Sequence, residues 1–314
     1  MDKKYVIGVD LGGTKIYTAL VDLEGNMIKE RVIETLAQEG EAAVAERILG
    51  TIDYVLEGTD KDLVKAIGIG SPGPLDAKNG IILETANLPF KNFEIVKAVK
   101  DRYEIPTYLD NDANVATLGE FMFGAGKGTE NMVFVTVSTG IGGGAIINGR
   151  LYRGNTANAL EVGHMTIAND GPRCGCGNIG CAESFASGTA IGKKAREAVA
   201  SKAKTSLKNY NHEVTAKEVF IESAAGDRVA TEILETSLNY LGITISNIMS
   251  HLDPEKVVMG GGVINGGDIV LERVREVVAK RCLGVFVENC SIEKAKLGGQ
   301  AGVLGAAALA ITEK

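Results

Sequence analysis

The sequence of 314 residues predicts an α/β protein made of two similar halves. Apolar strands that end in glycine-rich turns alternate with segments of helical periodicity. A strand–glycine turn–strand arrangement near the start also recurs about 130 residues later. The length suits two α/β domains. We expect a small domain at 1–118 plus 300–314 and a larger one at 119–299, with ligands at strand ends in the cleft between them.

The first elements are expected to be strands at residues 5–9, 16–21 and 27–34, joined as an antiparallel meander. Apolar residues then recur at intervals of three and four over 41–56, which predicts an amphipathic helix. A buried strand is expected at 66–70.

Asn92 is expected to cap the next helix. Residues 107–109 form a further strand, and a helix follows from about Ala113. The second half predicts a strand at 132–137 and a new strand from Ala145. It continues with a long helix at 228–252, a strand at 257–259 and an Ala-rich helix at 300–311.

Composition excludes several classes of protein. With 33 basic and 40 acidic residues, the chain has no electrostatic footprint for nucleic acid or for an anionic membrane. No apolar run reaches membrane-spanning length and no signal peptide opens the chain, so we expect a cytoplasmic protein.

The segment Asp10-Leu-Gly12-Gly13-Thr14-Lys15 joins the first two strands. Its glycines leave backbone N–H groups open to phosphate oxygens, because no Cβ stands in the way. Thr14 adds a hydroxyl donor, and Asp10 at the strand end can hold Mg²⁺ through water. A plain hairpin turn explains a single Gly-Gly pair at least as well, so this segment alone does not define a site.

Two more glycine-rich turns follow apolar strands in the second half. Ser138-Thr139-Gly140-Ile-Gly142-Gly143-Gly144 repeats the chemistry of the first turn, and the two together indicate a clamp on the β- and γ-phosphates of a nucleotide. Gly260-Gly261-Gly262 suits backbone that lies flat against adenosine. No Gly-Lys-Ser/Thr follows at P-loop spacing, and no Gly-x-Gly-x-x-Gly opens the chain.

The polar cluster Asp110-Asn111-Asp112-Ala-Asn114 follows a strand. A sugar hydroxyl is a poor nucleophile, so phosphoryl transfer to it needs a carboxylate that orients the hydroxyl and accepts its proton. An Asp at a strand end supplies this group, and a neighbouring amide can bind another hydroxyl. An Asx-rich helix cap explains the cluster equally well, so both interpretations stay open.

His164 precedes Cys174-x-Cys176-x4-Cys181 in a glycine-rich segment. Three thiolates and one imidazole are the ligands of a closed, tetrahedral, structural Zn²⁺ site. Small buried cysteines would not predict this spacing near one of only three histidines. We therefore expect zinc to brace a loop that holds Glu161 and Glu183, whose carboxylates can accept hydrogen bonds from sugar hydroxyls.

Together these motifs resemble those of the bacterial ROK family, the repressor–open-reading-frame–kinase group, over essentially the whole chain. Segments 10–15 and 138–144 resemble its two phosphate motifs. Glu161-Val-Gly-His164 and the segment from Cys174 to Glu183 resemble its zinc signature, complete and in order. The resemblance implies the two-domain, actin/hexokinase-like (ribonuclease H-like) ATPase fold, with an interdomain cleft and ATP-dependent phosphorylation of a hexose.

The resemblance also implies roles for individual residues. Asp112 is the expected general base, and His164 is expected to serve twice, with one ring nitrogen on zinc and the other facing the hexose. The expected sugar-binding residues are Gly73, Asn87, Asn111, Asp112, Glu161, His164 and Glu183. Those expected to bind ATP with its Mg²⁺ are Asp10, Gly12, Gly13, Thr14, Lys15, Thr139, Gly140, Gly142, Gly143, Gly261 and Gly262.

Within the family, Gly70-Ser-Pro-Gly-Pro-Leu-Asp76 and Ala86-Asn-Leu-Pro89 are most similar to glucokinases, so glucose is the expected substrate. Fructokinases, N-acetylhexosamine kinases and an allose kinase share the core motifs and stay as alternatives. A homodimer or larger homo-oligomer is implied as well.

Two other classes of protein are less well matched. Sugar-responsive repressors of the family carry a winged helix-turn-helix before the first phosphate motif, whereas nine residues precede Asp10 here. A chaperone-like ATPase shares the fold but has no use for the cysteine loop. We therefore expect an enzyme without a DNA-binding element.

Overall fold

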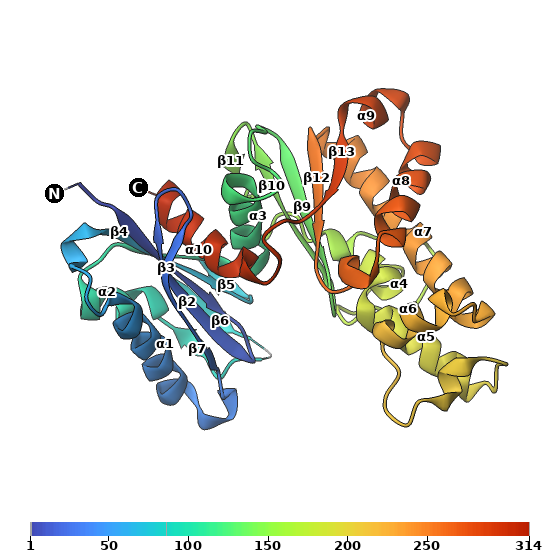
Figure 1. Ribbon diagram of the computed structural model, residues 1–314, viewed down its shortest axis with the longest axis horizontal. Coiled ribbons are helices and arrows are strands. Elements are labelled where there is room, and N and C mark those ends of the chain that lie inside the picture. The colour runs from blue at the N-terminus through green and yellow to red at the C-terminus, as the bar shows by residue number, and fades with distance from the viewer. Residues whose placement is uncertain (1, 86, 314) are drawn as a thin grey trace. The chain divides into compact units, whose positions relative to one another are not determined.

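The computed structural model describes residues 2–85 and 87–313, in which the chain forms two compact units (Figure 1). Ala86, part of one glucokinase-like segment, lies outside the described residues. Among the residues described, no helix is long and apolar enough to cross a membrane. The first unit is Met1–Gly128, Leu151–Ala159 and Lys296–Lys314, and the second is Thr129–Arg150 and Leu160–Ala295.

A five-stranded sheet in the order β3-β2-β1-β4-β8 forms the centre of the first unit. The first three strands form the expected antiparallel meander, whereas β1, β4 and β8 run parallel to one another. The strands are β1 (Tyr5–Leu11), β2 (Lys15–Asp22), β3 (Met27–Glu34), β4 (Val64–Ser71) and β8 (Thr107–Asn111); a small sheet adds β5 (Leu75–Asp76), β6 (Ile81–Glu84) and β7 (Lys91–Phe93).

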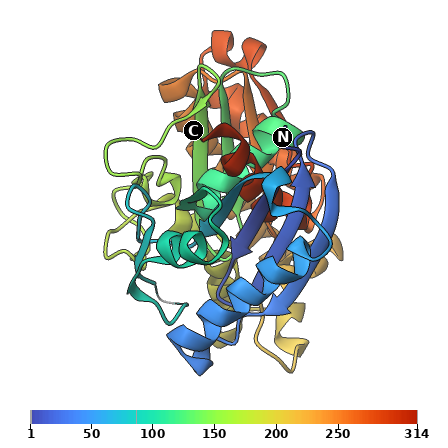
Figure 2. The ribbon, with the colours of Figure 1, turned by 90° about the vertical axis from the view of Figure 1, so that its left-hand side faces the viewer.

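Helices cover both faces of this sheet. On one face lies α1 (Glu41–Leu56), which has the predicted bounds and packs in one core with Ile7 and Val9 (Figure 2). On the other face α10 (Ala301–Thr312) packs with Val6 and Ala19. Side chains alternate between the faces of a strand, so neighbouring residues of β1 enter different cores. Two further helices complete the unit, α2 (Ile95–Tyr103) and α3 (Asp112–Phe123).

The second unit repeats a mixed five-stranded sheet, in the order β11-β10-β9-β12-β13. Its helices pack into one hydrophobic core, in which Val133, Val135 and Val137 of the central strand meet Leu241 and Ile245 of the longest helix. The strands are β9 (Met132–Val137), β10 (Ile141–Ile147), β11 (Arg150–Leu151), β12 (Lys256–Gly260) and β13 (Ser291–Lys294); the helices are α4 (Ala182–Ala186), α5 (Gly188–Ala200), α6 (Ala216–Ala224), α7 (Arg228–Leu252), α8 (Ile269–Arg281) and α9 (Gly284–Asn289).

Two local expectations are wrong. Asn92 does not cap α2: it lies inside β7 with a φ of 51°, a left-handed conformation that asparagine tolerates, and Glu94 occupies the N-cap position without a side-chain hydrogen bond. The strand expected from Ala145 begins earlier, at Ile141, because the glycines before Ala145 pair with β9.

The borders of the units also differ from the expected domain borders. The first unit extends beyond residue 118, since α3 packs along α10 and stays whole within it. It also takes in residues 151–159 between two segments of the second unit.

Glycines let α10 approach the first sheet closely. A Cβ built on Gly68 of β4 would lie 1.9 Å from the carbonyl oxygen of Ala306, and one on Gly8 of β1 would lie 2.1 Å from that of Val303. Both collisions are with helix backbone, which cannot rotate away as a side chain can. The position of α10 on the sheet therefore requires glycine at both positions.

We predict that Gly68→Ala lowers the free energy of unfolding by about 3 kcal/mol or more, because the helix must move off the sheet. Gly50→Ala is the matched control: Gly50 lies in α1 with nothing within 4 Å of its Cβ position, so alanine should stabilise the protein by about 0.5–1 kcal/mol. Urea unfolding measures both. Equal effects of the two substitutions would contradict the packing argument.

Candidate active site

The parallel strands of the first sheet bring two of the predicted motifs to one edge. Asp10 of β1 pairs with Gly70 of β4, and Gly70 pairs with Asp110 of β8. The carboxyl ends of parallel strands lie at the same edge of a sheet, where ligands of α/β folds gather. The turn that follows Asp10 and the residues that follow Asp110 therefore share this edge.

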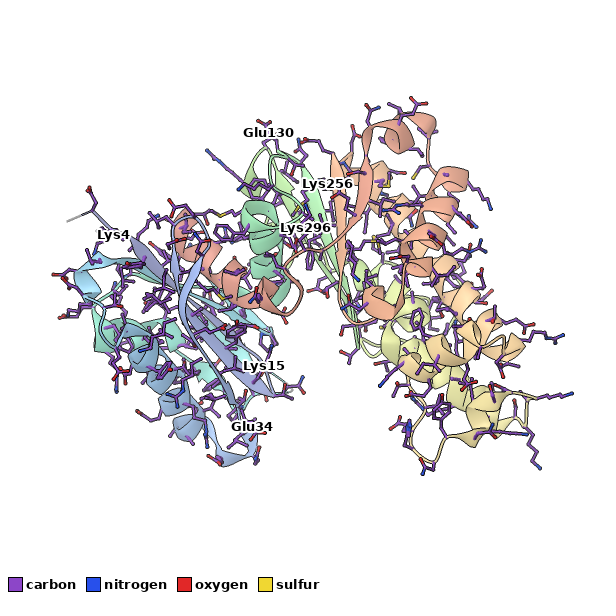
Figure 3. All side chains as sticks on the ribbon, viewed as in Figure 1. Lys4, Lys15, Glu34, Glu130, Lys256 and Lys296 are labelled. Carbon is purple, nitrogen blue, oxygen red and sulfur yellow. The ribbon has the colours of Figure 1, made fainter. Side chains whose placement is uncertain are left out.

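The first glycine turn is tight. The Gly12 N–H donates to the Lys15 carbonyl over 2.9 Å, and the Thr35 hydroxyl donates to the Gly12 carbonyl over 2.6 Å. A Cβ on Gly13 would lie 2.7 Å from the Cβ of Asn87, so Asn87 lies against this turn. Thr14 and Lys15 are exposed, and Lys15 stands at the start of β2 (Figure 3).

Asp10 lies half-buried beneath this turn. A Cβ on Gly302, at the start of α10, would lie 2.5 Å from the carboxyl carbon of Asp10, so only glycine leaves room for this carboxyl group. Burial raises the pKa of Asp10; the positive charge of Lys15 opposes the rise and the negative charge of Asp112 adds to it. Two neighbouring carboxylates that repel each other when ionised form a favourable site for a cation.

Asn111 and Asp112 occupy the first turn of α3 in different ways. The Asn111 side chain caps the helix, since its oxygen accepts from the Ala113 N–H over 2.9 Å. Its amide nitrogen lies 3.7 Å from the Cβ position of Gly73. Asp112 is exposed, with one carboxylate oxygen 2.8 Å from the same Ala113 N–H. The helix-cap interpretation is therefore right for Asn111, and it leaves the exposed carboxylate of Asp112 at the edge of the sheet.

In the second unit, Glu183 of α4 braces the second glycine turn. Its Oε2 accepts from the Ile141 N–H over 2.9 Å, and a Cβ on Gly140 would lie 2.5 Å from that oxygen. Its Oε1 lies 3.8 Å from the Cys174 sulfur. One carboxylate thus connects the glycine turn to the cysteine loop.

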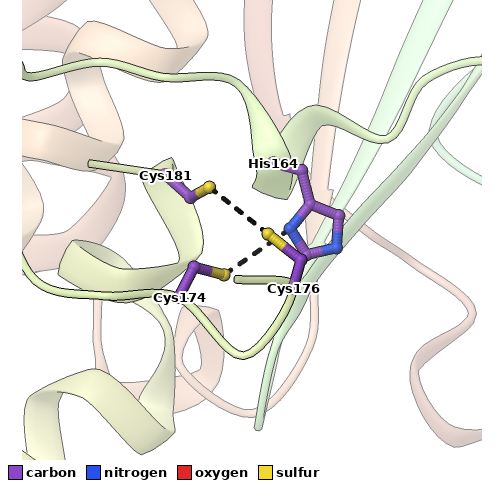
Figure 4. A group of neighbouring side chains, drawn as sticks. All are labelled: His164, Cys174, Cys176 and Cys181. Atoms are coloured by element: carbon purple, nitrogen blue, oxygen red, sulfur yellow. Dashed lines mark hydrogen bonds between the residues drawn. The ribbon is translucent and has the colours of Figure 1, made fainter. Parts of the chain in front are cut away.

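His164, Cys174, Cys176 and Cys181 form one cluster, with all four potential ligand atoms within 4.8 Å of one another (Figure 4). The Cys176 and Cys181 sulfurs are 3.7 Å apart, and His164 Nδ1 is 3.7 Å from the Cys174 sulfur. Zn–S bonds of about 2.3 Å in a tetrahedron put sulfurs about 3.8 Å apart. The donor set and its spacing therefore fit Zn²⁺.

The imidazole of His164 has its second nitrogen on the side of Glu161. His164 Nε2 lies 4.0 Å from Glu161 Oε2, whereas Nδ1 is turned towards the sulfurs. Both residues lie around η3 (Val162–His164), and Glu161 is exposed. One ring nitrogen is thus available for a metal and the other for a neighbour outside the cluster.

A cavity of about 620 Å³ opens beside the second glycine turn in the second unit. It meets the N-terminus of α5, where the Gly188 N–H donates to the Ser138 carbonyl over 2.7 Å. The Thr189 N–H and the Ala190 N–H also donate within the protein, so this helix end attracts an anion through the positive end of its dipole. Its lining also includes Thr139, Thr189, Arg196, Thr215, Lys217, Phe220, Gly262 and Asn265.

Of the predicted nucleotide-binding residues, Thr139 and Gly262 line this cavity. Gly143 lies within β10, where a Cβ would meet Val162 at 2.9 Å, and Gly261 has a φ of 96° with its Cβ position 2.4 Å from the Val137 carbonyl. Close packing therefore requires glycine at these two positions independently of any nucleotide.

The sequence reasoning missed the contribution of α5 and α6 to the cavity. Ser187 was the available signal, because its hydroxyl accepts from the Ala190 N–H over 3.1 Å and caps α5. Lys217 and Phe220 on α6 carried no comparable signal.

The fold and these residues define the class: an ATP-dependent sugar kinase with the two-domain actin/hexokinase-like fold. The chain belongs to the ROK family, whose signature matches residues 6–313.

Relatives and solved structures agree with this assignment. The glucokinase of Halalkalibacterium halodurans is 35% identical over 97% of this chain and 94% of its own length. The xylose repressor of Caldicellulosiruptor bescii is 31% identical over 98% of this chain and 78% of its own length.

Among solved structures, the ROK hexokinase of Thermus thermophilus matches with a TM-score of 0.84 and 34% identity, over 97% of both chains. The ROK glucokinase of Streptomyces griseus, in complex with glucose and AMPPNP, matches with a TM-score of 0.77 and 32% identity, over 97% of this chain and 98% of that one.

We predict that Asp10→Asn stabilises the Mg²⁺-free protein, and more so near pH 8 than near pH 4.5. Folding raises the pKa of Asp10, so ionising this carboxyl group costs more free energy in the folded protein than in the unfolded chain. The free energy of unfolding is therefore unaffected below the unfolded pKa and falls as the pH rises through the folded pKa. Urea unfolding at both pH values measures it. Asp76→Asn is a control of opposite sign, because the Asn79 side chain lowers the pKa of Asp76. An equal gain for Asp10→Asn at both pH values would contradict the argument.

Proposed function

We propose that this sugar kinase is a glucokinase, which transfers the γ-phosphoryl group of ATP to the 6-hydroxyl of glucose. One observation carries the proposal: the exposed Asp112 carboxylate lies at the same sheet edge as the glycine turn after Asp10, and the two carboxylates interact electrostatically. A proton acceptor and a phosphate-binding turn are thereby combined within one unit.

In the proposed reaction, Asp112 orients the sugar hydroxyl and accepts its proton as the bond to phosphorus forms. Asn111 offers its amide N–H₂ to a second hydroxyl, since its oxygen is already used in the helix cap. Gly73, next to that amide, presents backbone to the sugar. Asp10 would hold, through water, the Mg²⁺ that accompanies ATP; the ion would supply positive charge for the phosphates and would offset the repulsion between Asp10 and Asp112.

The cavity of the second unit supports nucleotide binding. Its volume of about 620 Å³ is in the range of small-molecule sites, and it joins a glycine turn to a helix N-terminus. Phe220 and Val263 offer apolar surface for a base, and Lys217 offers positive charge. We assign the adenosine to this cavity and the phosphates to the turn at Ser138 and Thr139.

The cysteine cluster would hold a structural Zn²⁺ through His164, Cys174, Cys176 and Cys181, as its donor set and spacing suggest. When bound, the ion supplies rigidity rather than chemistry, because protein atoms fill all four positions. Glu183, beside Cys174, and Glu161, beside the free nitrogen of His164, then serve as fixed acceptors for sugar hydroxyls.

Glucose is favoured over other hexoses by the similarity of the sequence to glucokinases, both locally and over the whole chain. The segment Gly70–Asp76 resembles glucokinases, and relatives named glucokinases are 33–36% identical to nearly the whole chain. Sugar-dependent ADP release from purified protein tests this, with glucose, mannose, fructose, allose and N-acetylglucosamine compared. A higher kcat/KM for another hexose would identify that hexose as the preferred substrate in place of glucose. Sugar binding without ADP release would point to a sugar-binding regulator.

In the same assay we predict that Asp112→Asn lowers kcat by about 10²–10⁴-fold, since general-base catalysis contributes on that order. The amide keeps the size of the side chain and one acceptor oxygen, so glucose binding measured by calorimetry should persist. Comparable turnover in this variant would remove Asp112 from the mechanism.

We also predict one zinc ion per chain by elemental analysis. Cys176→Ser should lose the metal and lower the melting temperature, because a structural site with three protein ligands holds zinc weakly. Cys290→Ser is the matched control, since Cys290 lies outside the cluster. Full activity of metal-free wild-type protein would refute the structural role.

A further inference from the structure

Asp110, next to the proposed sugar-binding residues, is buried with an exposed fraction of 1%. One of its carboxylate oxygens accepts from the Asn111 N–H over 2.8 Å and from the Asn114 amide over 2.7 Å. The other accepts from Arg153 Nε over 2.6 Å. A carboxylate buried this deeply is stable only with such partners, and Arg153 is the cationic one.

Arg153 lies far from Asp110 in sequence but in the same unit. It belongs to residues 151–159, a segment that begins at the last residue of β11 and packs with the first unit. A second guanidinium nitrogen donates to Glu313, just after α10, over 2.6 Å. One guanidinium group therefore joins the end of β8, this segment and the end of α10.

The same segment borders the proposed sugar-binding residues. Ala157 and Asn158 line a small recess together with Gly73 and Asn111. The Ala159 N–H donates to the Arg153 carbonyl over 3.2 Å, which closes the segment into a loop. The ion pairs that hold Arg153 thus also hold the loop that places Asn158 in the wall of the recess.

We propose that Arg153 is a positioning residue for phosphoryl transfer: through Asp110 it fixes the backbone that carries Asn111 and Asp112, and through its own loop it fixes the facing wall of the recess. This inference rests on the proposed role of Asp112. Without Arg153, the buried Asp110 carboxylate loses its cation and must gain a proton or water. The hydrogen bond to the Asn111 N–H weakens, and Asp112 is held less accurately.

Arginine is needed here for its shape as well as its charge. Its planar fork reaches Asp110 with Nε and Glu313 with a terminal nitrogen, whereas a lysine ammonium is a single point of charge on a flexible stem. Misplacement of a reacting group by about 1 Å can cost about 100-fold in rate. We expect the effect on kcat, with little change in KM for ATP, because the cavity assigned to adenosine lies in the other unit.

The test is Arg153→Ala in the glucose assay, with chemical rescue. A cavity of about 840 Å³ in the first unit borders Arg153, so methylguanidinium has access to the space that the side chain leaves. We expect kcat to fall about 10- to 100-fold, KM for ATP to stay within about twofold, and millimolar methylguanidinium to restore several-fold activity. Methylammonium, with the same charge but no fork, should restore less.

Arg102→Ala is the matched control, since Arg102 forms an ion pair of equal length, 2.6 Å, with Asp53 elsewhere in the same unit. Its kcat should equal that of the wild type. Wild-type kcat in Arg153→Ala would overturn the inference, as would a loss that matches a fall in melting temperature and resists methylguanidinium.

If Arg153→Ala does not fold, Arg153→Lys decides, because lysine keeps the charge: reduced kcat with unchanged KM for ATP supports the inference, and wild-type kinetics overturns it. Wild-type protein inactive on every hexose would overturn the proposed function and this inference together. Active wild type with an unaffected Arg153 variant would overturn this inference alone.

Discussion

Helix α10 can lie on β1 and β4 because Gly8 and Gly68 present only backbone to it, and the site in the first unit depends on this close approach. Gly302 at its start leaves space for the carboxyl group of Asp10. Further along, a Cβ on Gly305 would lie 1.8 Å from the Val115 carbonyl, so α3 also packs against α10 at backbone distance. The position of Asp112 on α3 thus follows from contacts that allow little adjustment.

The negative charges of Asp10 and Asp112 at this sheet edge repel each other in the folded protein, and the proposed binding of a nucleotide with its cation accounts for their presence. Asp10 and Asp112 raise each other's energy when ionised; the positive charge of Lys15 opposes this at Asp10, and a divalent cation that enters with the nucleotide would oppose it further. Asp110, only two residues before Asp112, is managed differently: Arg153 and two further donors satisfy it inside the protein. In the proposed reaction, aspartate thus serves a ligand at Asp112, where it is exposed, and the scaffold at Asp110, where it is buried.

Much of the fold was predictable because local patterns agree with the tertiary structure. α1, α7 and β9 have the expected bounds, since their apolar periodicity coincides with the cores they enter. β3 also has the expected bounds, but none of its residues is buried and its pairing with β2 holds it in the sheet. The prediction for Asn92 failed because this residue lies within the small sheet as part of β7, so the helix begins two residues later than a cap at Asn92 requires.

The candidate site was predictable where one short segment holds all its parts, as in the cysteine cluster. The cavity of the second unit was not, because its walls come from turns and helices spread over more than 100 residues of sequence. Arg153 and Asp110 are separated by 43 residues, and neither carries a local signal of their pairing.

The place of α10 in the first unit bears on how the protein is made. Ribosomes release chains from the N-terminus at about 5–20 residues per second, so the segments of the second unit are all present before α10 emerges. Until then Val6, Ala19 and Ala66, which share a core with α10 in the folded protein, lack the helix that covers them. The core of the second unit can therefore form before α10 is available to complete the core of the first unit.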